Sequence, residues 1–470
     1  MQQSLDKKRL GHVYKKILYK EYTDINFNQT KYKPDHHGFI GPVLKVEVGD
    51  DLVVYFKNNA SMVLTVHPHG VIYDKANEGS VYRGQPGVNP GTVHRYTWNV
   101  TEDSGPPMGT GCVSHLYHSS AQYIKDVQAG LFGFIQVCAN NDSGDKSPFN
   151  KNLFLFIGIN NENENPVSNT SGTDEESNKM HSINGYVYGN LPNLTLCVGV
   201  TTRLHIGSLS DSTDIHGLRL HGHTFAHGGK RYETVSIYPG VSITVEVTPA
   251  EQGKWLLSST SSNHIKAGMQ ALVTVKECGE ARPIIEADGE IREYYIAAGE
   301  VNWQGKTRVM FTGYTNRTFE EQNTRETSTS YLGALGPLIM TEVGDVLKIV
   351  FFNKLNQSLT IVPTGLRTSK QYEGKHYNDD VSDKVITGPG EKRTYYWFVP
   401  KYFGPNTGDE DCIHKVYSMD YQDEQTLLGP ILVCRRKKLI ERSNEILMDT
   451  SAASTFLEFQ PVLVQTTGFT

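Results

Sequence analysis

The sequence has no long apolar run, no strong excess of one charge and few cysteines. No apolar stretch approaches the roughly 20 residues that a transmembrane helix needs, so we expect no membrane span in this chain. The formal charge is −6 over 470 residues, which does not favour nucleic acid or an anionic membrane as a partner. Neither a Gly-rich phosphate loop nor a nucleophile elbow is present, and we assign no catalytic residue.

The N-terminus lacks the apolar centre of a signal peptide, because it begins MQQSLDKKRL. The rest of the chain nevertheless carries many Asn-x-Ser/Thr sequons, which are typical of a secreted glycoprotein. These sequons lie at Asn28, Asn59, Asn99, Asn141, Asn169, Asn193, Asn316 and Asn356. We therefore predict an extracellular protein whose signal peptide is missing from this chain.

The six cysteines fall into three pairs, each near the ends of what looks like one domain. This arrangement predicts three intradomain disulfides and an oxidising compartment, with six reduced core thiols as the alternative. The pairs are Cys112 with Cys138, Cys197 with Cys278, and Cys412 with Cys434.

An internal repeat sets the layout of the domains. Residues 38–58 (GFIGPVLKVEVGDDLVVYFKN) match residues 333–353 (GALGPLIMTEVGDVLKIVFFN) at a constant offset of 295, so two domains are copies of one unit. A chain of 470 residues is long enough for about three domains. We predict domains at residues 1–147, 148–285 and 286–436, followed by a polar tail, for which a helix is one interpretation, at 437–470.

The local pattern is that of strands. Short runs rich in Val, Ile, Tyr, Phe and Thr alternate with Gly, Pro and Asn turns, and no long segment holds a helical period. The predicted fold class is all-β, as three tandem Greek-key β-sandwiches. The third domain opens with REYYIAAGEVNW (292–303), whereas the first domain lacks a comparable opening strand. The polar residues 161–180 predict an exposed loop.

Several stretches together resemble the ceruloplasmin/hephaestin-type multicopper oxidases, and also the A domains of coagulation factors V and VIII. They include GFIGPVLKVEVGD, HPHGVIYDKANEG, LYHSSAQYIKDVQAGLFGFIQVC, SNKMHSINGYVYGNLPNLTLC and WLLSSTSSNHIKAGMQALVTV. The likeness spans about residues 10–434 and is closest to the first three domains of ceruloplasmin. It implies cupredoxin-like sandwiches, copper as the cofactor, and a lineage of extracellular ferroxidases that oxidise Fe(II) with O2.

The resemblance places a type 1 copper site in the middle domain, at His216, position 259, His264 and Met269. Such a site uses two His, a Cys thiolate and a weak axial Met. Ser259 stands at the thiolate position, and a neutral hydroxyl is a poor ligand for a soft metal. We expect a vestigial site in which a buried His pair is retained for packing, with a weak His2Met copper site as the alternative.

The resemblance also places part of a trinuclear copper cluster in domain 1. His67 and His69 are separated by one residue, and on a strand two such side chains point to the same face. His118 belongs to the second expected pair, but Ser120 stands where a fourth His belongs. We expect either residual copper binding at partial occupancy by His67, His69 and His118, or a preserved His cluster without a metal.

The other domains do not complete this cluster. Arg219, Ser258 and Thr260 in domain 2 stand at positions where an active copy of the family has His. Domain 3 has no His at its equivalent positions, which are Val362, Thr364, Ser418 and Asp420. The His-rich stretch HGHTFAH (221–227) lies in a loop-like region, where adventitious binding of copper or zinc is as good an interpretation as a designed site.

The resemblance raises calcium as a second cofactor. The domain 1 loop SVYRGQPGVNPG contains no Asp, which argues against a site there. Domain 3 keeps HYNDDVSDK (376–384), with Asp379, Asp380 and Asp383. Oxygen-rich loops can bind Ca²⁺, although an Asp cluster in a solvated turn is the more common outcome.

Two classes of function therefore compete. In the first, the full-length form or its close kin oxidise Fe(II), and this chain is inactive alone because it lacks the type 1 Cys and a complete trinuclear cluster. In the second, the chain is a non-enzymatic scaffold that binds protein partners of unknown identity, as the coagulation cofactors do. The His67/His69 pair favours the first class, and Ser259 and Ser120 favour the second. Association of two chains into a six-domain ring is a third hypothesis.

Overall fold

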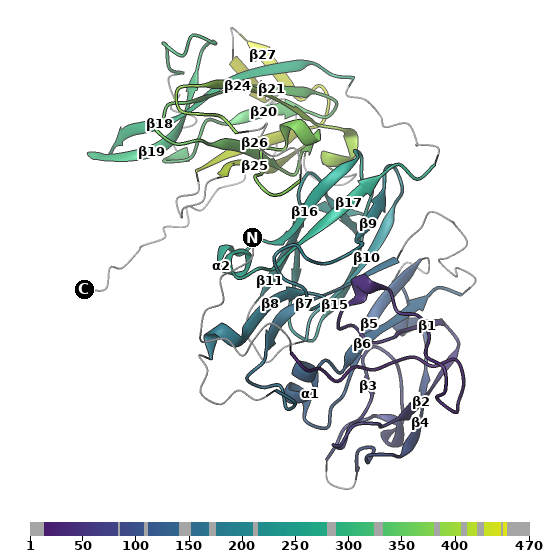
Figure 1. Ribbon diagram of the computed structural model, residues 1–470. Coiled ribbons are helices and arrows are strands. Elements are labelled where there is room, and N and C mark those ends of the chain that lie inside the picture. Colours follow the sequence, from purple (N-terminus) through teal and green to yellow (C-terminus); the bar gives the residue numbers. More distant parts are fainter. Residues whose placement is uncertain are drawn as a thin grey trace.

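The structure, a computed structural model, describes residues 14–82, 85–107, 111–140, 152–168, 175–209, 215–279, 288–323, 332–379, 386–405, 411–420, 427–442 and 445–448. Strands dominate it and fall into three successive groups along the chain (Figure 1). The domain boundaries that we predicted at 147/148 and 285/286 lie outside the described residues and stay predictions. Within the ranges given, no helix has the length and apolar character needed to cross a membrane.

Domain 1 consists of a four-stranded sheet, in the order β1-β6-β5-β3, and a two-stranded sheet of β2 and β4. Strand β1 runs parallel to β6, while β5 is antiparallel to both β6 and β3. The elements are β1 (Val43–Glu47), β2 (Asp51–Lys57), β3 (His67–Pro68), β4 (Val93–Asn99), β5 (Cys112–His118), α1 (Tyr123–Ala129) and β6 (Phe132–Cys138), with 3₁₀ turns η1 (Asp35–His37), η2 (Lys75–Asn77) and η3 (Glu102–Ser104).

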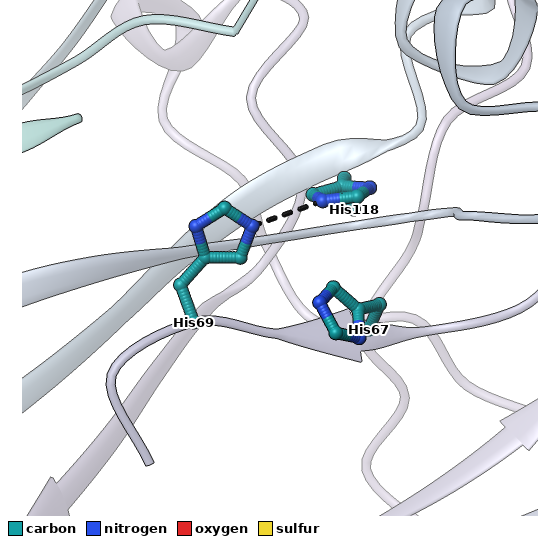
Figure 2. A group of neighbouring side chains, drawn as sticks. All are labelled: His67, His69 and His118. Atoms are coloured by element: carbon teal, nitrogen blue, oxygen red, sulfur yellow. Dashed lines mark hydrogen bonds between the residues drawn. The ribbon is translucent and has the colours of Figure 1, made fainter. Parts of the chain in front are cut away.

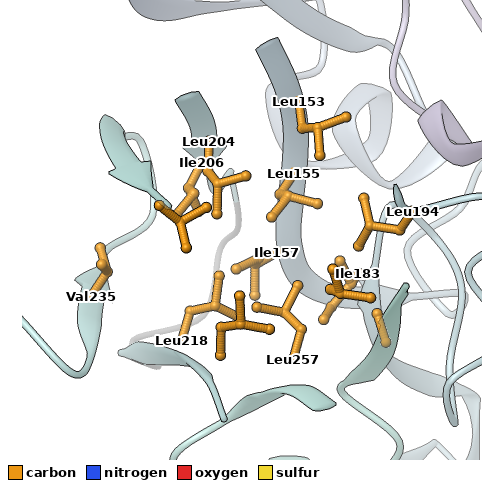
Figure 3. Packing of buried hydrophobic residues seen from close by; sticks show 14 of the residues in the cluster. Leu153, Leu155, Ile157, Ile183, Leu194, Leu204, Ile206, Leu218, Val235 and Leu257 are labelled. Atoms are coloured by element: carbon orange, nitrogen blue, oxygen red, sulfur yellow. The ribbon is translucent and has the colours of Figure 1, made fainter. Parts of the chain in front are cut away.

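Domain 2 packs a six-stranded sheet, β13-β12-β15-β10-β7-β8, against a five-stranded sheet, β14-β11-β16-β17-β9. Figure 3 shows the core between them, where Leu155 and Leu204 from the first sheet face Leu218 and Leu257 from the second. The elements are β7 (Asn152–Asn161), η4 (Glu176–Asn178), β8 (Lys179–Ile183), β9 (Thr195–Cys197), β10 (Thr202–Gly207), β11 (His216–Leu220), β12 (Phe225–His227), β13 (Lys230–Tyr232), β14 (Val235–Ile237), β15 (Ser242–Val247), β16 (Gly253–Ser259), α2 (Ser262–Lys266) and β17 (Gln270–Lys276).

Domain 3 packs a five-stranded sheet, β19-β18-β21-β24-β23, against a four-stranded sheet, β20-β26-β25-β22. The second sheet repeats the order and pairing of the domain 1 sheet β1-β6-β5-β3, as expected for copies of one unit. The elements are β18 (Ile291–Trp303), β19 (Lys306–Tyr314), β20 (Ile339–Glu342), β21 (Val346–Asn353), β22 (Thr360–Thr364), β23 (Arg367–Thr368), η6 (Lys370–Tyr372), β24 (Lys392–Phe398), η8 (Lys401–Phe403), β25 (Cys412–Asp420) and β26 (Leu428–Cys434). The fold is thus all-β, in three tandem cupredoxin-like Greek-key β-sandwiches, as predicted.

Each sandwich contains one of the three predicted disulfides. Two of the bonds join cysteines that lie directly opposite each other on neighbouring antiparallel strands, in β5 and β6 and again in β25 and β26. The third bond joins β9 to the segment that follows β17. The bonded pairs are Cys112–Cys138, Cys197–Cys278 and Cys412–Cys434.

The junction between domains 1 and 2 contains an apolar cluster beside polar contacts such as the Lys16–Glu162 ion pair. Phe132 stacks on Phe156 with ring centroids 3.9 Å apart, and Phe134 lies 5.4 Å from Phe154. These four residues belong to one buried cluster that also includes Leu209 of domain 2. The burial of so much apolar surface across the junction stabilises the contact between the two sandwiches.

The junction between domains 2 and 3 is polar and ionic. The Lys370 ammonium contacts the carboxylate of Glu373 and lies 4.7 Å from the ring centroid of Trp255 in domain 2. Tyr377 accepts a hydrogen bond from the backbone N–H of Leu256 at 3.2 Å. Burial raises the pKa of Glu373 to about 7, against the opposing effect of Lys370. A second ion pair, Lys415 with Glu233, also crosses this junction.

The prediction of an exposed loop at residues 161–180 is wrong for the residues that flank its undescribed part, 169–174. Glu162, Asn165 and Asn178 are buried. Lys16 reaches Glu162 with an Nζ–Oε1 distance of 2.6 Å, and Asn165 donates a hydrogen bond from its side chain to the Lys15 carbonyl. The N-terminal segment therefore neutralises and covers a stretch whose polarity alone suggested exposure.

The interpretation of the tail as a helix is also wrong where the tail is described. Strand β27 (Leu439–Arg442) pairs antiparallel with β28 (Glu445–Met448). The carboxylate of Glu342 accepts hydrogen bonds from the backbone N–H groups of Lys438 and Leu439, which fixes the start of this hairpin against domain 3.

Candidate metal centre

Strand pairing in domain 1 brings the three predicted histidines together. His67 on β3 lies opposite His118 on β5, and the backbone N–H of His69 donates to the Leu116 carbonyl. A glycine must follow, because a Cβ at Gly70, where φ is +68°, would lie 2.1 Å from Nδ1 of His115. The sequence VHPHG therefore presents two imidazoles on one side of a short strand.

The three rings turn toward one another (Figure 2). His67, His69 and His118 each offer one ring nitrogen, and these atoms lie within 4.8 Å of one another. Nε2 of His69 lies 3.0 Å from Nε2 of His118. Among the described residues this is the only group of three or more His, Cys, Asp or Glu side chains close enough to hold a metal ion.

Backbone carbonyls fix the tautomers of two of the rings. Nδ1 of His67 lies 2.6 Å from the Glu78 carbonyl, and Nδ1 of His118 lies 2.9 Å from the Ser119 carbonyl. A carbonyl oxygen only accepts, so each Nδ1 carries the hydrogen and each neutral ring keeps its lone pair on Nε2. Histidine ligands of metals commonly donate the N–H of their non-ligating ring nitrogen to a backbone carbonyl in this way.

Burial keeps two of the three histidines neutral. It lowers the pKa of His118 to about 3 and that of His69 to about 4, with neighbouring histidines adding to both shifts. Both imidazoles are therefore unprotonated at neutral pH, which is the form that binds a metal. A donor set of imidazole nitrogens suits copper.

Ser120 does not complete the cluster as a fourth nitrogen ligand. Its backbone N–H donates to the Thr65 hydroxyl at 2.8 Å, and the residue forms an isolated bridge with Ser80. The structure thus unites the three histidines that the sequence offered, and Ser120 stands at the sequence position where the fourth was expected.

The residues of the vestigial type 1 site also come together. His216 begins β11, Ser259 ends β16, and His264 lies in α2, with the rings of His216 and His264 5.1 Å apart. The Ser259 hydroxyl lies 3.3 Å from Nδ1 of His264. Met269 is buried in the hydrophobic core of domain 2. The two histidines and Ser259 thus lie together, the thiolate is absent from the sequence, and a vestigial type 1 site stays a prediction.

Two residues near these sites escaped the sequence analysis. His181 on β8 places its ring 5.0 Å from that of His264. Glu78 fixes the His67 tautomer through its backbone carbonyl, which no side-chain pattern reveals. The stretch MHSINGY contains His181 and lies among the segments that carry the family resemblance, but the expected ligand positions did not include it.

The remaining metal candidates have different outcomes. His221 and His223 in HGHTFAH lie in a loop-like stretch, as expected, but they are buried, and burial lowers the pKa of His223 to about 4. In the calcium candidate, the Asp379 carboxylate lies 2.6 Å from the Lys370 ammonium. Asp380 and Asp383 lie outside the described residues, so a calcium site stays a prediction.

Comparisons with known proteins agree with this organisation. The family model described as multicopper oxidase matches residues 28–142. Hephaestin of Rattus norvegicus is 33% identical over 93% of this chain and 43% of its own length. Ceruloplasmin of Homo sapiens is 31% identical over 92% of this chain and 47% of its own length. The ferroxidase HEPHL1 of Homo sapiens is 32% identical over 91% of this chain and 43% of its own length. The chain spans less than half the length of these curated relatives.

Solved structures show more distant likeness. A crystal structure of a multicopper oxidase is 20% identical with a TM-score of 0.41, covering 50% of this chain and 78% of that one. A blue copper oxidase from Nitrosomonas europaea is 18% identical with a TM-score of 0.40, covering 50% of this chain and 76% of that one. The family model and the similarity to hephaestin and ceruloplasmin over more than nine-tenths of the sequence give the assignment: this chain belongs to the ceruloplasmin/hephaestin-type multicopper oxidases.

Proposed function

We propose that this chain contributes a copper-binding half-site to a ferroxidase of its family, and that His67, His69 and His118 hold one copper ion. One observation carries the proposal. The three imidazoles converge within 4.8 Å, and backbone carbonyls orient two of them with their Nε2 lone pairs available. Copper, when bound, supplies one-electron redox chemistry.

Residues around the cluster fix the orientation of the imidazole rings in the absence of a metal. The carbonyls of Glu78 and Ser119 hold the His67 and His118 rings in one tautomer. The ring of Tyr123 lies 4.7 Å from His118 and that of Tyr73 lies 5.9 Å from His67. Aromatic rings therefore lie beside two of the three histidines.

We propose further that this chain alone does not oxidise iron. Ser259 replaces the thiolate that takes an electron in a type 1 site, and Ser120 replaces a fourth imidazole. The similarity to the ferroxidase HEPHL1 supports Fe(II) as the substrate of a full-length form. In that form, the missing ligands belong to domains outside these 470 residues.

An extracellular location fits the covalent chemistry of the chain. Three disulfides are typical of an oxidising compartment. Every sequon asparagine that the structure describes is exposed and therefore accessible to a glycan, namely Asn28, Asn59, Asn99, Asn193, Asn316 and Asn356. Asn141 and Asn169 lie outside the described residues.

Copper content and the visible spectrum of the copper-loaded chain test the half-site. We expect at most about one copper per chain and no intense blue band, because a blue site needs a Cys ligand. His67→Ala and His118→Ala should each lose this copper, whereas His94→Ala, at an exposed histidine of the same domain, should keep it. Equal copper content in all four proteins would contradict the assignment.

Iron-dependent O2 consumption tests the second part of the proposal. We expect none from this chain alone. Consumption that disappears in His67→Ala would show that the chain is a complete oxidase.

A non-enzymatic scaffold is the second candidate function. The hydrogen-bond distance of 3.3 Å between Ser259 and His264 favours it, because a hydroxyl there can stabilise the domain without a metal. Absence of copper from the loaded wild-type chain would support this candidate and direct the search to protein partners.

A further inference from the structure

A lysine, a glutamate and an asparagine form a buried cluster beside the junction of domains 1 and 2. Lys16 belongs to the segment that precedes β1, whereas Glu162 and Asn165 follow the end of β7. The side chains of Lys16 and Glu162 are 6% and 1% exposed, and Asn165 is 2% exposed. Amines and carboxylates are almost never so completely buried unless they are paired, so each of these groups depends on its contacts with the others.

The Glu162 carboxylate bridges the lysine amine and the asparagine carboxamide. Nζ of Lys16 lies 2.6 Å from Oε1 of Glu162. Nδ2 of Asn165 donates to Oε2 at 2.8 Å and to the Lys15 carbonyl at 3.0 Å. One carboxylate oxygen thus contacts the lysine nitrogen while the other contacts the amide nitrogen, so a proton can pass between the two nitrogens through a single side chain.

The surroundings of Lys16 favour its neutral form. The Phe39 ring centroid lies 5.1 Å from Nζ, and the Gln128 carbonyl accepts a hydrogen bond from Nζ at 2.8 Å. Burial lowers the pKa of Lys16, and Glu162 opposes this effect only in part. A lysine in such a site loses its proton more readily than one in water, and the neutral amine is a nucleophile.

The carbonyl oxygen of the Asn165 side chain also has a donor. The backbone N–H of Val167 donates to Oδ1 at 3.2 Å. Oδ1 is the atom on which negative charge develops when a nucleophile attacks Cγ, and a backbone N–H stabilises such a charge. The site therefore has the parts of an acyl transfer: an amine nucleophile, a carboxylate that moves protons, and a donor to the oxyanion.

We propose that Lys16 and Asn165 join in an intramolecular isopeptide bond, with Glu162 as the group that transfers the proton. The Nζ lone pair of the neutral amine forms a bond to Cγ of Asn165, and the carbonyl electron pair moves to Oδ1. Glu162 accepts a proton from Nζ and delivers a proton to Nδ2. The Cγ–Nδ2 bond then breaks, the carbonyl re-forms, and Nδ2 leaves as ammonia. One amine and one carboxamide thus give one secondary amide and one ammonia, with no oxidation or reduction.

This bond ties the segment before β1 to domain 2. Each of the three disulfides joins two cysteines of one sandwich, whereas the isopeptide bond crosses the junction between domains 1 and 2 and survives reduction. A cross-link between residues so far apart in the chain stabilises the fold by restricting the unfolded state.

Tryptic digestion of the reduced and deglycosylated full chain, followed by tandem mass spectrometry, tests the bond. We expect one branched peptide that joins residues 16–20 (KILYK) to residues 152–179. Its mass should be that of the two linear peptides less one ammonia, about 17 Da, and its fragments should place the branch at Lys16 and Asn165. Wild-type digests that contain only unlinked peptides would overturn the proposal.

Variants at the three positions test the role of each group. Lys16→Arg and Asn165→Ala should abolish the branched peptide. Glu162→Gln keeps both reacting groups and should lower the yield by about tenfold or more, because it removes the general acid–base group. An unchanged yield in folded Glu162→Gln protein would overturn the role of Glu162. The wild-type digest decides whether the bond exists even where a variant does not fold.

Asn163→Ala is the matched control. Nδ2 of Asn163 donates to the Asn161 side chain and to the Glu175 carbonyl rather than to Glu162. This variant should form the branched peptide as the wild type does. A branched peptide that is lost in Asn163→Ala and kept in Asn165→Ala would overturn the assignment of the reacting carboxamide.

Discussion

At the scale of single residues, the side chain at position 259 separates a copper site from a packing cluster. Its hydroxyl lies 3.3 Å from Nδ1 of His264, and the His216 ring lies 5.1 Å from the His264 ring. A thiol of similar size at this position would lose its proton to a metal and become the strongest ligand of the set. The surrounding sandwich keeps the other positions of the site in place.

Ser259→Cys should therefore produce an intense blue absorption band when the protein is loaded with Cu(II), because His216, Cys and His264 with axial Met269 form a blue-copper ligand set. Ser258→Cys is the matched control, since its side chain lies near His221 on the other side of β16 and should give no such band. A folded Ser259→Cys protein that binds copper without the band would show that the four positions are no longer arranged as a ligand set.

His205 is a residue whose titration affects stability away from both copper positions. It is fully buried, and its ring nitrogens lie 3.0 Å from the Thr244 hydroxyl and 3.0 Å from the Asn152 side-chain oxygen. Burial lowers its pKa to about 3, with a smaller effect from Arg203. Below pH 6.5 His205 is therefore protonated in the unfolded chain but stays neutral in the folded chain. Acid consequently lowers the free energy of unfolding.

We expect His205→Gln to flatten this dependence by about 1 kcal/mol per pH unit between pH 6.5 and 5, below the limit of about 1.4 kcal/mol per pH unit that one proton sets. Denaturant unfolding of both proteins at several pH values measures it. Above pH 7 neither protein should show a slope from this position, which serves as the internal control. Parallel slopes below pH 6.5 would mean that His205 is protonated in the folded protein.

At the scale of elements, the equivalent turns η2 and η6 each carry a Lys–Glu ion pair, exposed in domain 1 and buried in domain 3. In domain 1, Lys75 lies 2.6 Å from Glu78, which also accepts a hydrogen bond from Tyr82. The Lys75 side chain is 70% exposed, whereas its counterpart Lys370 is 9% exposed. The Lys370 ammonium forms ion pairs with Glu373 and with Asp379, whose carboxylate oxygen lies 2.6 Å from Nζ. The repeat gives both domains the same Lys–Glu ion pair. The contact with domain 2 buries the pair in domain 3, so only there does it contribute strongly to stability.

Lys370→Ala should lower the free energy of unfolding by about 3 kcal/mol or more, because it leaves two buried carboxylates without their counter-charge. Lys75→Ala should leave the melting temperature unchanged, since water replaces an exposed ion pair. Calorimetry of the two variants side by side makes the comparison. Equal effects would mean that the junction between domains 2 and 3 opens in solution.

At the scale of the whole molecule, the disulfides stabilise the sandwiches unequally. The Cys197–Cys278 bond closes a separation of 81 residues and the Cys412–Cys434 bond closes one of 22. In the chain-entropy account these loops correspond to about 4.5 and about 3.4 kcal/mol. Replacing the first pair with Ser should therefore lower the melting transition of its domain more than replacing the second, as non-reducing calorimetry can measure. The opposite order would show that strain or residual structure outweighs loop length.

The sequence predicts much of this organisation because its signals are periodic or paired. Alternating apolar residues in 38–58 and 333–353 indicate strands and their copies. The spacing of His67 and His69 indicates a shared face, and the family resemblance adds His118 to them. Other features depend on contacts between distant segments. Glu162 is buried because Lys16, 146 residues earlier in the chain, neutralises it. His181 joins the vestigial site only because β8 folds beside α2, as its 5.0 Å ring contact with His264 shows.

The two junctions respond differently to temperature. Apolar burial of the kind that joins Phe132 to Phe156 weakens on cooling, because its stabilisation at room temperature is largely entropic. The desolvation penalty of ion pairs such as Lys415–Glu233 falls as temperature rises. Cold therefore weakens the apolar part of the contact between domains 1 and 2, while the ion pairs between domains 2 and 3 keep their strength on warming. The middle domain therefore has one junction whose apolar part is sensitive to cold and another junction whose ion pairs tolerate heat.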